Sequence, residues 1–364
     1  MAFLRSTWYV GMWGQDLEPG ELTQRVICDE PIALFRKTDG TAAAIADQCA
    51  HRFAPLSRGR VCGDKVECPY HGLQFDENGT CVVNPHGSGR IPPSLNIRSY
   101  PIVERHTILW IWMGDQPADA SLIPDYSHLD EDAPGVVSKR DWMVIDVDYR
   151  LMADNLLDLS HVNYLHDGLL GNAELVSADV DIHQDGDTLY VTRTSHSVTP
   201  PLMFDLMYRN DSKPVDTWAE MRWDAPGYLR NHAGVTQPGK SRESGMTVIG
   251  SHLLTPINAT QMRYHIAAVQ LGGPPPGETD DEIAERLSTL RRFAFEEQDR
   301  PMVEAQQQAY DRAGGPDNLK PIMLSIDAGP LRARRILDRK IAEEAAPVGV
   351  VGAVVVGGRQ PSPV

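Results

Sequence analysis

The sequence lacks the features that mark secreted, membrane-spanning and nucleic-acid-binding proteins. Five cysteines in 364 residues are too few for the disulfide framework of a small secreted domain. No stretch reaches the roughly 18 apolar residues of a membrane span, and the first residues lack the charged-then-apolar build of a signal peptide. The net charge of -16 argues against nucleic acid, because phosphate binding requires a basic surface. We therefore expect a cytoplasmic protein that contacts neither a membrane nor nucleic acid.

The chain does contain enough apolar residues for two domains with cores of their own. Hydrophobic residues make up 41% and charged residues 23%, which is ordinary for a globular protein. Before residue 115, short apolar runs separated by Gly and Pro predict an all-β domain. Residues 31–47 give two such runs around an Asp39-Gly40 turn, and residues 107–113 are another strand candidate.

The pattern changes after a linker that begins near residue 116. Apolar spacing predicts a helix from Tyr149 to about Tyr164, strands over 188–196, 247–256 and 261–271, and helices over 281–312 and 331–345. We therefore expect an α+β fold with an all-β domain at 1–115 and an α+β domain at 116–345. Residues 346–364 are low in complexity and are expected to form a disordered tail.

Two pairs of metal-binding residues lie close together within the expected all-β domain. Cys49 and His51 form a CxH pair, and Cys68 and His71 form a CxxH pair sixteen residues further on. A Rieske cluster of two irons and two sulfides needs this mixed set, because two thiolates hold one iron and two imidazoles hold the other. The spacing therefore predicts a 2Fe-2S electron carrier.

A structural zinc site is the alternative use of two cysteines and two histidines. Zinc fingers usually place two cysteines on one arm and two histidines on the other, whereas here each arm carries one of each. Pro69 and Gly72 also predict a tight loop around the second pair. We expect the three other cysteines to be ordinary thiols: Cys28, Cys62 and Cys81.

Positive charges gather beside the expected cluster in this acidic chain. They belong to Arg52, Arg58, Arg60 and Lys65. Such a run is either a solvated surface or a docking patch that attracts an acidic electron donor by charge.

A second set of candidate ligands lies about 90 residues downstream. On the expected helix, Asn155, Asp158 and His161 are three residues apart and share one face, so Asp158 is placed to accept a hydrogen bond from the His161 ring. His166 reaches the same point only if the helix ends first, and Gly168 is a suitable ending. The shared face of Asn155, Asp158 and His161 is either a metal site or a solvated helix surface. An electron carrier in the same chain favours an oxygen-activating iron held by two histidines and a carboxylate.

The carboxylate must come from elsewhere in the chain. The expected late helix offers four candidates: Glu296, Glu297, Asp299 and Glu304. Spacing does not choose among them. Pro301 removes a helical hydrogen bond and kinks the helix, which turns the neighbouring turn toward the interior.

The chain resembles the oxygenase components of Rieske non-heme iron oxygenases, and among them the vanillate and dicamba O-demethylases. The likeness runs from about residue 5 to about residue 345. It is carried by residues 7–13 (TWYVGMW), 49–60 (CAHRFAPLSRGR), 68–76 (CPYHGLQFD) and 148–168 (DYRLMADNLLDLSHVNYLHDG). It implies a Rieske cluster and a mononuclear Fe(II), with Asp299 completing the iron site of His161 and His166.

The resemblance also implies an assembly and a reaction. Asp158 would bridge His161 to the cluster ligand His71 of a neighbouring subunit in a ring-shaped homotrimer, and Asn155 would support the iron site. The chain shows no GxGxxG fingerprint, so NAD(P)H would be oxidised by a separate reductase or ferredoxin system. The implied reaction joins O2 to a small aromatic substrate, and O-demethylation of a methoxylated aromatic acid is the first hypothesis.

Asn231 and His252 resemble residues that orient the substrate in the demethylases. His232 and His265 compete with them for this role on sequence alone. Two other functions stay open at this point. The same iron could hydroxylate a ring or a methyl group, or the chain could be an electron-transfer protein without a catalytic iron.

Overall fold

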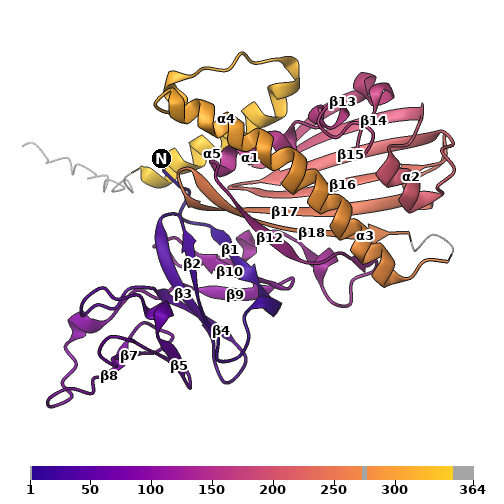
Figure 1. Ribbon diagram of the computed structural model, residues 1–364. Coiled ribbons are helices and arrows are strands. Elements are labelled where there is room, and N and C mark those ends of the chain that lie inside the picture. The colour runs from indigo at the N-terminus through magenta and orange to yellow at the C-terminus, as the bar shows by residue number, and fades with distance from the viewer. Residues whose placement is uncertain (1, 273–276, 347–364) are drawn as a thin grey trace, which may run out of the picture.

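The computed structural model describes residues 2–272 and 277–346, and the tail expected to be disordered lies outside this range from residue 347 on. Figure 1 shows a small all-β part followed by a large twisted sheet with helices. The expected order of an all-β and then an α+β domain is confirmed. None of the helices within the described residues is both long enough and apolar enough to cross a membrane.

Three small antiparallel sheets build the N-terminal part. The first contains β1 (Trp8–Trp13), β10 (Ile108–Trp112) and β9 (Ile102–Arg105), and the second contains β2 (Leu22–Ile27), β3 (Glu30–Arg36) and β4 (Ala42–Ala46). The third contains β5 (Arg60–Cys62), β6 (Lys65–Glu67), β7 (Gln74–Phe75) and β8 (Cys81–Val83). The predicted hairpin joins β3 to β4, and Gly40 takes a φ of 86° in its turn.

One eight-stranded antiparallel sheet forms the centre of the C-terminal part. Its strands are β11 (Val136–Val137), β12 (Asp141–Ile145), β13 (Asp179–Asp185), β14 (Thr188–Val198), β15 (Val215–Asp224), β16 (Tyr228–Thr236), β17 (Met246–Asn258) and β18 (Gln261–Leu271). The three strands predicted in this region correspond to β14, β17 and β18. The sheet joins segments far apart in sequence, since β12 and β17 both pair with β18.

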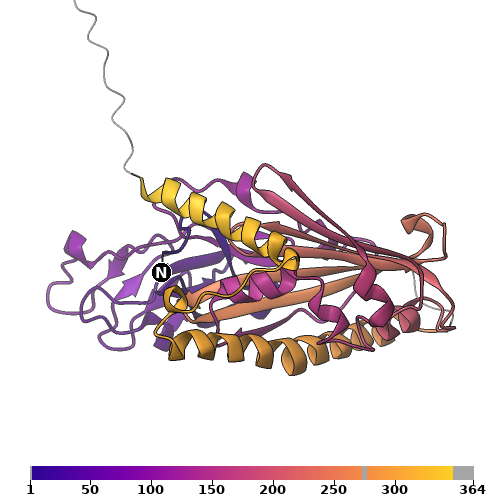
Figure 2. The same cartoon turned by 90° about the horizontal axis from the view of Figure 1, so that it is seen from above.

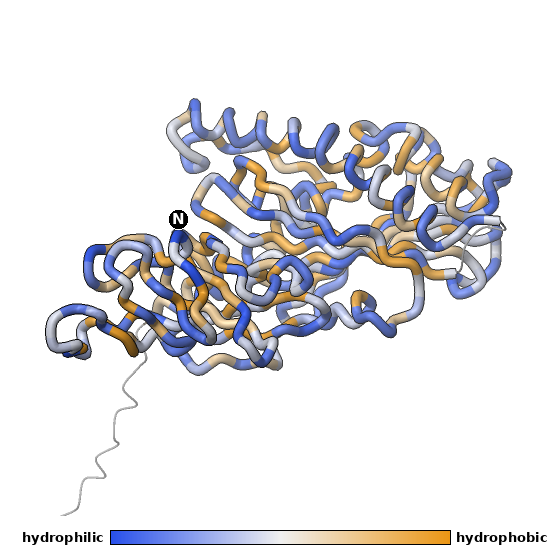
Figure 3. Tube along the Cα trace, turned by 60° about the horizontal axis from the view of Figure 1, so that its bottom comes forward, coloured by the Kyte–Doolittle hydropathy of each residue, from blue (hydrophilic) through white to orange (hydrophobic). Residues whose placement is uncertain are grey.

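Both faces of this sheet are covered, which explains why β17 and β18 are buried along most of their length. On one face, Trp13 and Trp110 of the N-terminal sheet pack against Leu253 and Val269. On the other face lie α1 (Tyr149–Leu157), α2 (Leu202–Tyr208) and the long helical segment labelled α3 and α4 in Figure 1. Figure 2 shows that α5 (Ala328–Ala345) lies on the same face, where it packs against α1 and β14. Hydrophobic residues gather along the central strands, and the outer turns of the helices are mostly hydrophilic (Figure 3).

Three helical predictions need correction. The helix that begins at Tyr149 ends at Leu157 instead of near Tyr164, because Asp158 leaves the helical conformation with φ -84° and ψ 84°. A short 3-10 turn, His161–Asn163, follows.

The long predicted helix has three parts: α3 (Asp280–Arg292), a π-helix (Phe293–Asp299) and α4 (Arg300–Arg312). Thr279 and Glu282 form a capping box at its start. The expected irregularity near Pro301 is therefore a widened turn before the proline.

The last helix begins at Ala328 and not at Leu331.

Candidate metal centres

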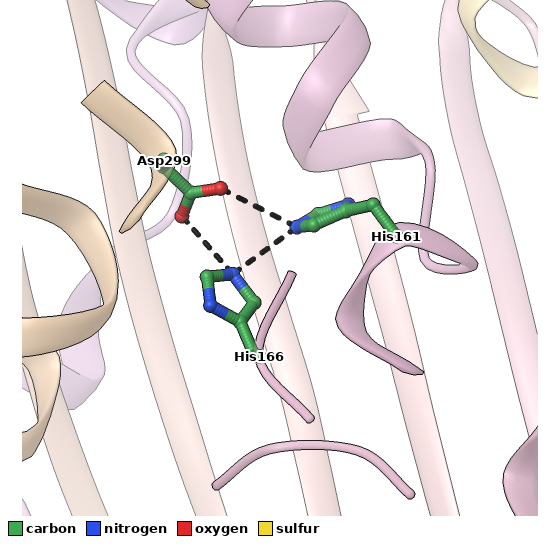
Figure 4. Close-up of side chains that lie close together, drawn as sticks. All are labelled: His161, His166 and Asp299. Carbon is green, nitrogen blue, oxygen red and sulfur yellow. Dashed lines mark hydrogen bonds and ion pairs between the residues drawn. The ribbon is translucent and has the colours of Figure 1, made fainter. Parts of the chain in front are cut away.

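Three side chains from two distant segments converge on one point beside the sheet. His161 lies on the 3-10 turn after α1, His166 on the loop that follows, and Asp299 at the end of the π-helix. The two Nε2 atoms are 3.3 Å apart, and the Asp299 oxygens lie 3.5 Å from His161 Nε2 and 3.3 Å from His166 Nε2 (Figure 4). Ligands that meet at right angles on an ion with bonds of about 2.1 Å lie roughly 3 Å apart.

The surroundings of Asp299 fit a cation at this point. Its side chain is 1% exposed, and Oδ2, which lies 3.3 Å from His166 Nε2, has no hydrogen-bond partner among the described residues. A buried carboxylate without a compensating charge is strongly unfavourable, so a divalent ion between the three groups would stabilise the site. Burial lowers the pKa of His161, which favours the neutral ring that binds a metal. Two histidines and one carboxylate on one side of an ion are the ligand set of oxygen-activating Fe(II).

The second nitrogen of each histidine ring is held by an acceptor. His166 Nδ1 donates to Gln298 Oε1 at 2.8 Å, and His161 Nδ1 donates to the backbone carbonyl of Asp158. Both bonds leave Nε2 free to face Asp299, which is the usual arrangement of ligating histidines. Sequence reasoning missed Gln298. In the sequence, its position directly before Asp299 could have suggested that Gln298 lies near the metal site.

The prediction that the Asp158 carboxylate accepts a hydrogen bond from the His161 ring is therefore wrong. Since α1 ends at Leu157, the carboxylate turns back and accepts hydrogen bonds from the backbone N–H, at 2.9 Å, and the hydroxyl of Ser160. The backbone carbonyl of Asp158 replaces its carboxylate as the acceptor for the ring. The expected single helical stripe of Asn155, Asp158 and His161 is broken for the same reason.

Asn155 nevertheless points at the site. Its Nδ2 donates to Asp299 Oδ1 at 3.0 Å, so it holds the carboxylate in position. The competing carboxylates lie elsewhere: Glu296 is 3.7 Å from Arg292, and Glu304 is 2.9 Å from Arg300. Glu297 is exposed. The structure thus selects Asp299 from the four candidates.

The four expected cluster ligands sit on two loops of matching geometry. In the first loop Cys49 N–H donates to the Ala54 carbonyl at 2.9 Å, and in the second Cys68 N–H donates to the Leu73 carbonyl at 2.8 Å. Both thiols are buried in the core of the small domain, at 1% and 2% exposure, while the rings of His51 and His71 lie 4.6 Å apart.

This arrangement fits a Rieske cluster, which needs one pair of thiolates and one pair of imidazoles. Burial raises the pKa of Cys49 to about 11, and nearby Cys68 opposes its ionisation further. Two adjacent buried thiols therefore become thiolates only when a metal compensates their charge. No disulfide joins any of the five cysteines within the described residues.

The two expected substrate residues share the helix-covered face of the sheet. Asn231 on β16 pairs with Gly250 on β17, and His252 follows two residues later on the same face. A Cβ at Gly250 would lie 2.8 Å from His252 Nε2, so this glycine leaves room for the ring beside Asn231. The His252 ring is 5.4 Å from that of Phe295 on the π-helix, which places it near the metal site.

Both residues carry polar groups suited to a bound ligand. The Oδ1 of Asn231 is buried and has no hydrogen-bond partner within the described part of the chain, and His252 Nδ1 is 2.5 Å from the hydroxyl of Tyr264. Burial, followed by the nearby Arg291, lowers the pKa of His252 to about 3, so the ring is neutral. His232 points to the opposite face by strand alternation, and His265 is buried there against Trp13.

A cavity of about 1310 Å³ opens beside the metal site between α1, α4 and α5. Asn155, Asp158 and His161 line it together with exposed apolar side chains such as Tyr164 and Ile322.

In the basic run near the cluster, Arg60 pairs with Glu67 at 2.6 Å. Within the part of the chain that the structure describes, Arg52 and Arg58 have no ion pair and are exposed.

Comparison with known proteins gives matches over nearly the whole chain. A family described as "Rieske [2Fe-2S] domain" matches residues 7–101, and "Vanillate O-demethylase oxygenase C-terminal domain" matches residues 145–343. The chain is 36% identical to the oxygenase component of chloroacetanilide N-alkylformylase from Rhizorhabdus wittichii, over 95% of this chain and 97% of that protein. It is also 36% identical to the oxygenase component of dicamba O-demethylase from Stenotrophomonas maltophilia, over 95% and 100%.

A solved structure agrees with these matches. The crystal structure of dicamba monooxygenase bound to 3,6-dichlorosalicylic acid superposes with a TM-score of 0.88 at 32% identity, covering 95% of this chain and all of that one. Another crystal structure of dicamba monooxygenase, with non-heme iron and dicamba, gives a TM-score of 0.77.

Proposed function

The chain belongs to the Rieske non-heme iron oxygenases as the oxygenase component of a multicomponent system, and we propose that it O-demethylates a methoxylated aromatic acid. The convergence of His161, His166 and Asp299 in a chain that also carries a Rieske domain is the observation that carries this proposal. An electron carrier without catalytic iron would not need this triad. A separate reductase supplies the electrons.

Each part of the chain has a defined task in this scheme. When bound, the Rieske cluster relays single electrons and the mononuclear Fe(II) activates O2. We propose that Cys49, His51, Cys68 and His71 hold the cluster. Asn155 and Gln298 fix the orientation of Asp299 and His166.

The neutral pair of Asn231 and His252 is proposed to bind the polar end of the substrate. Apolar side chains lie on the same face near the pair, among them Val248, Ala268 and Leu287, and they suit an aromatic ring. Because His252 is neutral, its contribution is a directed hydrogen bond without a charge. The ring of the substrate then lies between this pair and the three iron ligands.

We propose that electrons reach the iron from a neighbouring copy in a homotrimer, through His71 of one chain and Asp158 of the next. Figure 1 shows the short strands β5, β7 and β8 at the far end of the molecule from α1. Tyr70 lies against His71 with ring centroids 4.0 Å apart and is 59% exposed, so it offers an apolar contact beside that ligand. The cavity at Asp158, with its exposed apolar lining, is a suitable receiving surface. A head-to-tail contact of this kind closes into a ring.

We propose domain boundaries at residues 115 and 345 and a cytoplasmic location for the protein. The family matches at 7–101 and 145–343 are compatible with the boundaries. A reducing compartment suits five cysteines that form no disulfide within the described residues.

Hydroxylation of a ring or methyl group is the second candidate. A toluene-4-sulfonate monooxygenase subunit from Comamonas testosteroni is 33% identical over 94% of this chain. The test is oxygen uptake with a panel of methoxybenzoates, alkyl anilides and methylated aromatic acids, using a borrowed reductase. We expect a methoxybenzoate to stimulate uptake and to release one formaldehyde per O2. A retained hydroxymethyl group would favour the second candidate, and no stimulation by any aromatic would contradict both.

A further inference from the structure

A buried tyrosine contacts the histidine that the proposed function assigns to substrate binding. Tyr264 on β18 pairs with Leu254 on β17, so its side chain shares the helix-covered face with His252, which lies two residues before Leu254. The Tyr264 hydroxyl is 2.5 Å from His252 Nδ1. These two rings and the ring of Phe295 form a cluster with centroids 5.4 to 6.0 Å apart. Tyr264 is therefore held against one nitrogen of the His252 ring.

The direction of this hydrogen bond follows from the surroundings of the hydroxyl group. Tyr264 is 0% exposed, and within the described residues His252 Nδ1 is the one hydrogen-bond partner of its hydroxyl. Burial raises the pKa of Tyr264, so the group keeps its proton. If His252 donated from Nδ1, the hydroxyl hydrogen would be buried without an acceptor, which is unfavourable. The Tyr264 hydroxyl therefore donates, and His252 Nδ1 accepts.

The other nitrogen of the His252 ring must then carry the hydrogen. The ring is neutral, because burial lowers its pKa to about 3, and a neutral imidazole has one N–H group. Since Nδ1 is the acceptor, this N–H group is at Nε2. No residue in the ranges 2–272 and 277–346 accepts a hydrogen bond from Nε2. His252 Nε2 is thus a donor that is free to bind a ligand.

Gly250 keeps space open between this donor and Asn231. A Cβ on Gly250 would lie 2.8 Å from His252 Nε2 and 3.6 Å from the Cβ of Asn231, so a larger residue would crowd the donor. Ala268 pairs with Gly250 on the neighbouring strand, and its small side chain adds an apolar wall. The amide of Asn231 offers both a donor and an acceptor, so it fits either kind of polar group. His252 fits only an acceptor, and it therefore decides which group binds here.

We propose that Tyr264 fixes the tautomer of His252, so that the site selects aromatic substrates with a carboxylate or carbonyl oxygen and disfavours those whose polar group only donates. Tyr264 is a positioning residue in this scheme, because it acts on the substrate through His252. This inference rests on the proposed function and narrows its substrate class. The contact is a hydrogen bond, and no covalent bond forms or breaks.

The test measures by calorimetry how tightly the full-length protein binds two neutral ligands of similar size. Methoxyacetophenone has a carbonyl oxygen that only accepts, whereas methoxyaniline has an amino group that chiefly donates. We expect the parent protein to bind the ketone about tenfold more tightly, because the aniline leaves His252 Nε2 without a partner. In Tyr264→Phe the ring can take either tautomer. The ketone should then bind more weakly and the aniline more tightly, and the preference should fall to about twofold or less.

Tyr9→Phe is the matched control. It also removes the hydroxyl of a fully buried tyrosine, which here donates to the Leu4 carbonyl at 2.8 Å, and it should keep the preference of the parent protein. An unchanged preference in Tyr264→Phe, or an equal loss of affinity for both ligands, would overturn the assigned role. A parent protein that prefers the aniline would overturn it as well. A parent protein that binds neither ligand and no methoxybenzoate would instead refute the proposed function, and this inference with it.

Discussion

At the scale of single residues, the metal site depends on groups that do not touch the ion. Gln298 and the Asp158 carbonyl hold the outer nitrogens of the two histidines, and Asn155 holds the carboxylate. The sequence could reveal the ligating types, because histidine and carboxylate have few other uses in an apolar setting. It could not reveal Gln298, since an amide near a helix end is common and its role appears only when His166 folds against it.

Gln298→Leu tests this support directly. The leucine removes the acceptor of His166 Nδ1, so we expect Fe(II) affinity to fall about 10–100-fold while the fold is kept. Competition with a chromophoric chelator measures the affinity. Gln298→Glu keeps an acceptor at the same place and should bind iron at least as well as the parent. Equal affinity in Gln298→Leu would show that the ring is held by other groups.

Asp158→Asn tests the proposed bridge between copies. Asparagine still accepts the hydrogen bond from Ser160 N–H, and the backbone carbonyl that holds His161 is unchanged, so both metals should stay bound. We expect electron arrival at the iron to slow by at least tenfold, because a charge-assisted contact with His71 is lost. Single-turnover oxidation of the reduced cluster gives the rate. A parent-like rate would exclude the bridging role.

At the scale of elements, the end of α1 and the π-helix bring the ligands together. Apolar periodicity located both helical regions correctly, because burial of one face is written in the spacing of Leu151, Leu156 and Val303. It extended the first helix too far and missed the widened turn. Neither feature has a propensity signal in the sequence, because the end of α1 and the π-helix are both set by contacts made in the folded protein.

Deleting Glu297 tests whether the π-helix sets the site. Residue 297 is exposed, and removing one residue takes about 100° of rotation out of the helix, which turns Asp299 away from His161 and His166. We expect the mononuclear iron to be lost while helix content by circular dichroism and the cluster spectrum are kept. Glu297→Ala keeps the residue count and serves as the control. Retained iron in the deletion would mean that the surrounding helices reposition Asp299 on their own.

At the scale of the whole molecule, the account requires electrons to pass between chains. The overall order of an all-β and an α+β domain followed from the sequence, because each has its own pattern of apolar residues. Assembly did not follow in the same way: the contact proposed between His71 and Asp158 joins surfaces that one chain cannot bring together.

Mixed assemblies test this transfer. His161→Ala chains keep a cluster but lack the iron, and Cys49→Ser chains keep the iron but lack the cluster. Neither should turn over alone. Co-expressed with different tags and purified as mixed trimers, they should consume oxygen with an active aromatic substrate. Mixed trimers that are inactive, although each kind of chain holds the metal group it can still bind, would place electron transfer within one chain.

The most direct measurement of the central claim is the iron and acid-labile sulfide content of the purified protein. We predict about three irons and two sulfides per chain, and about two irons in His161→Ala with the visible absorption of the cluster unchanged. A parent protein with only two irons would contradict the catalytic site, and a colourless, zinc-containing protein would contradict the account as a whole.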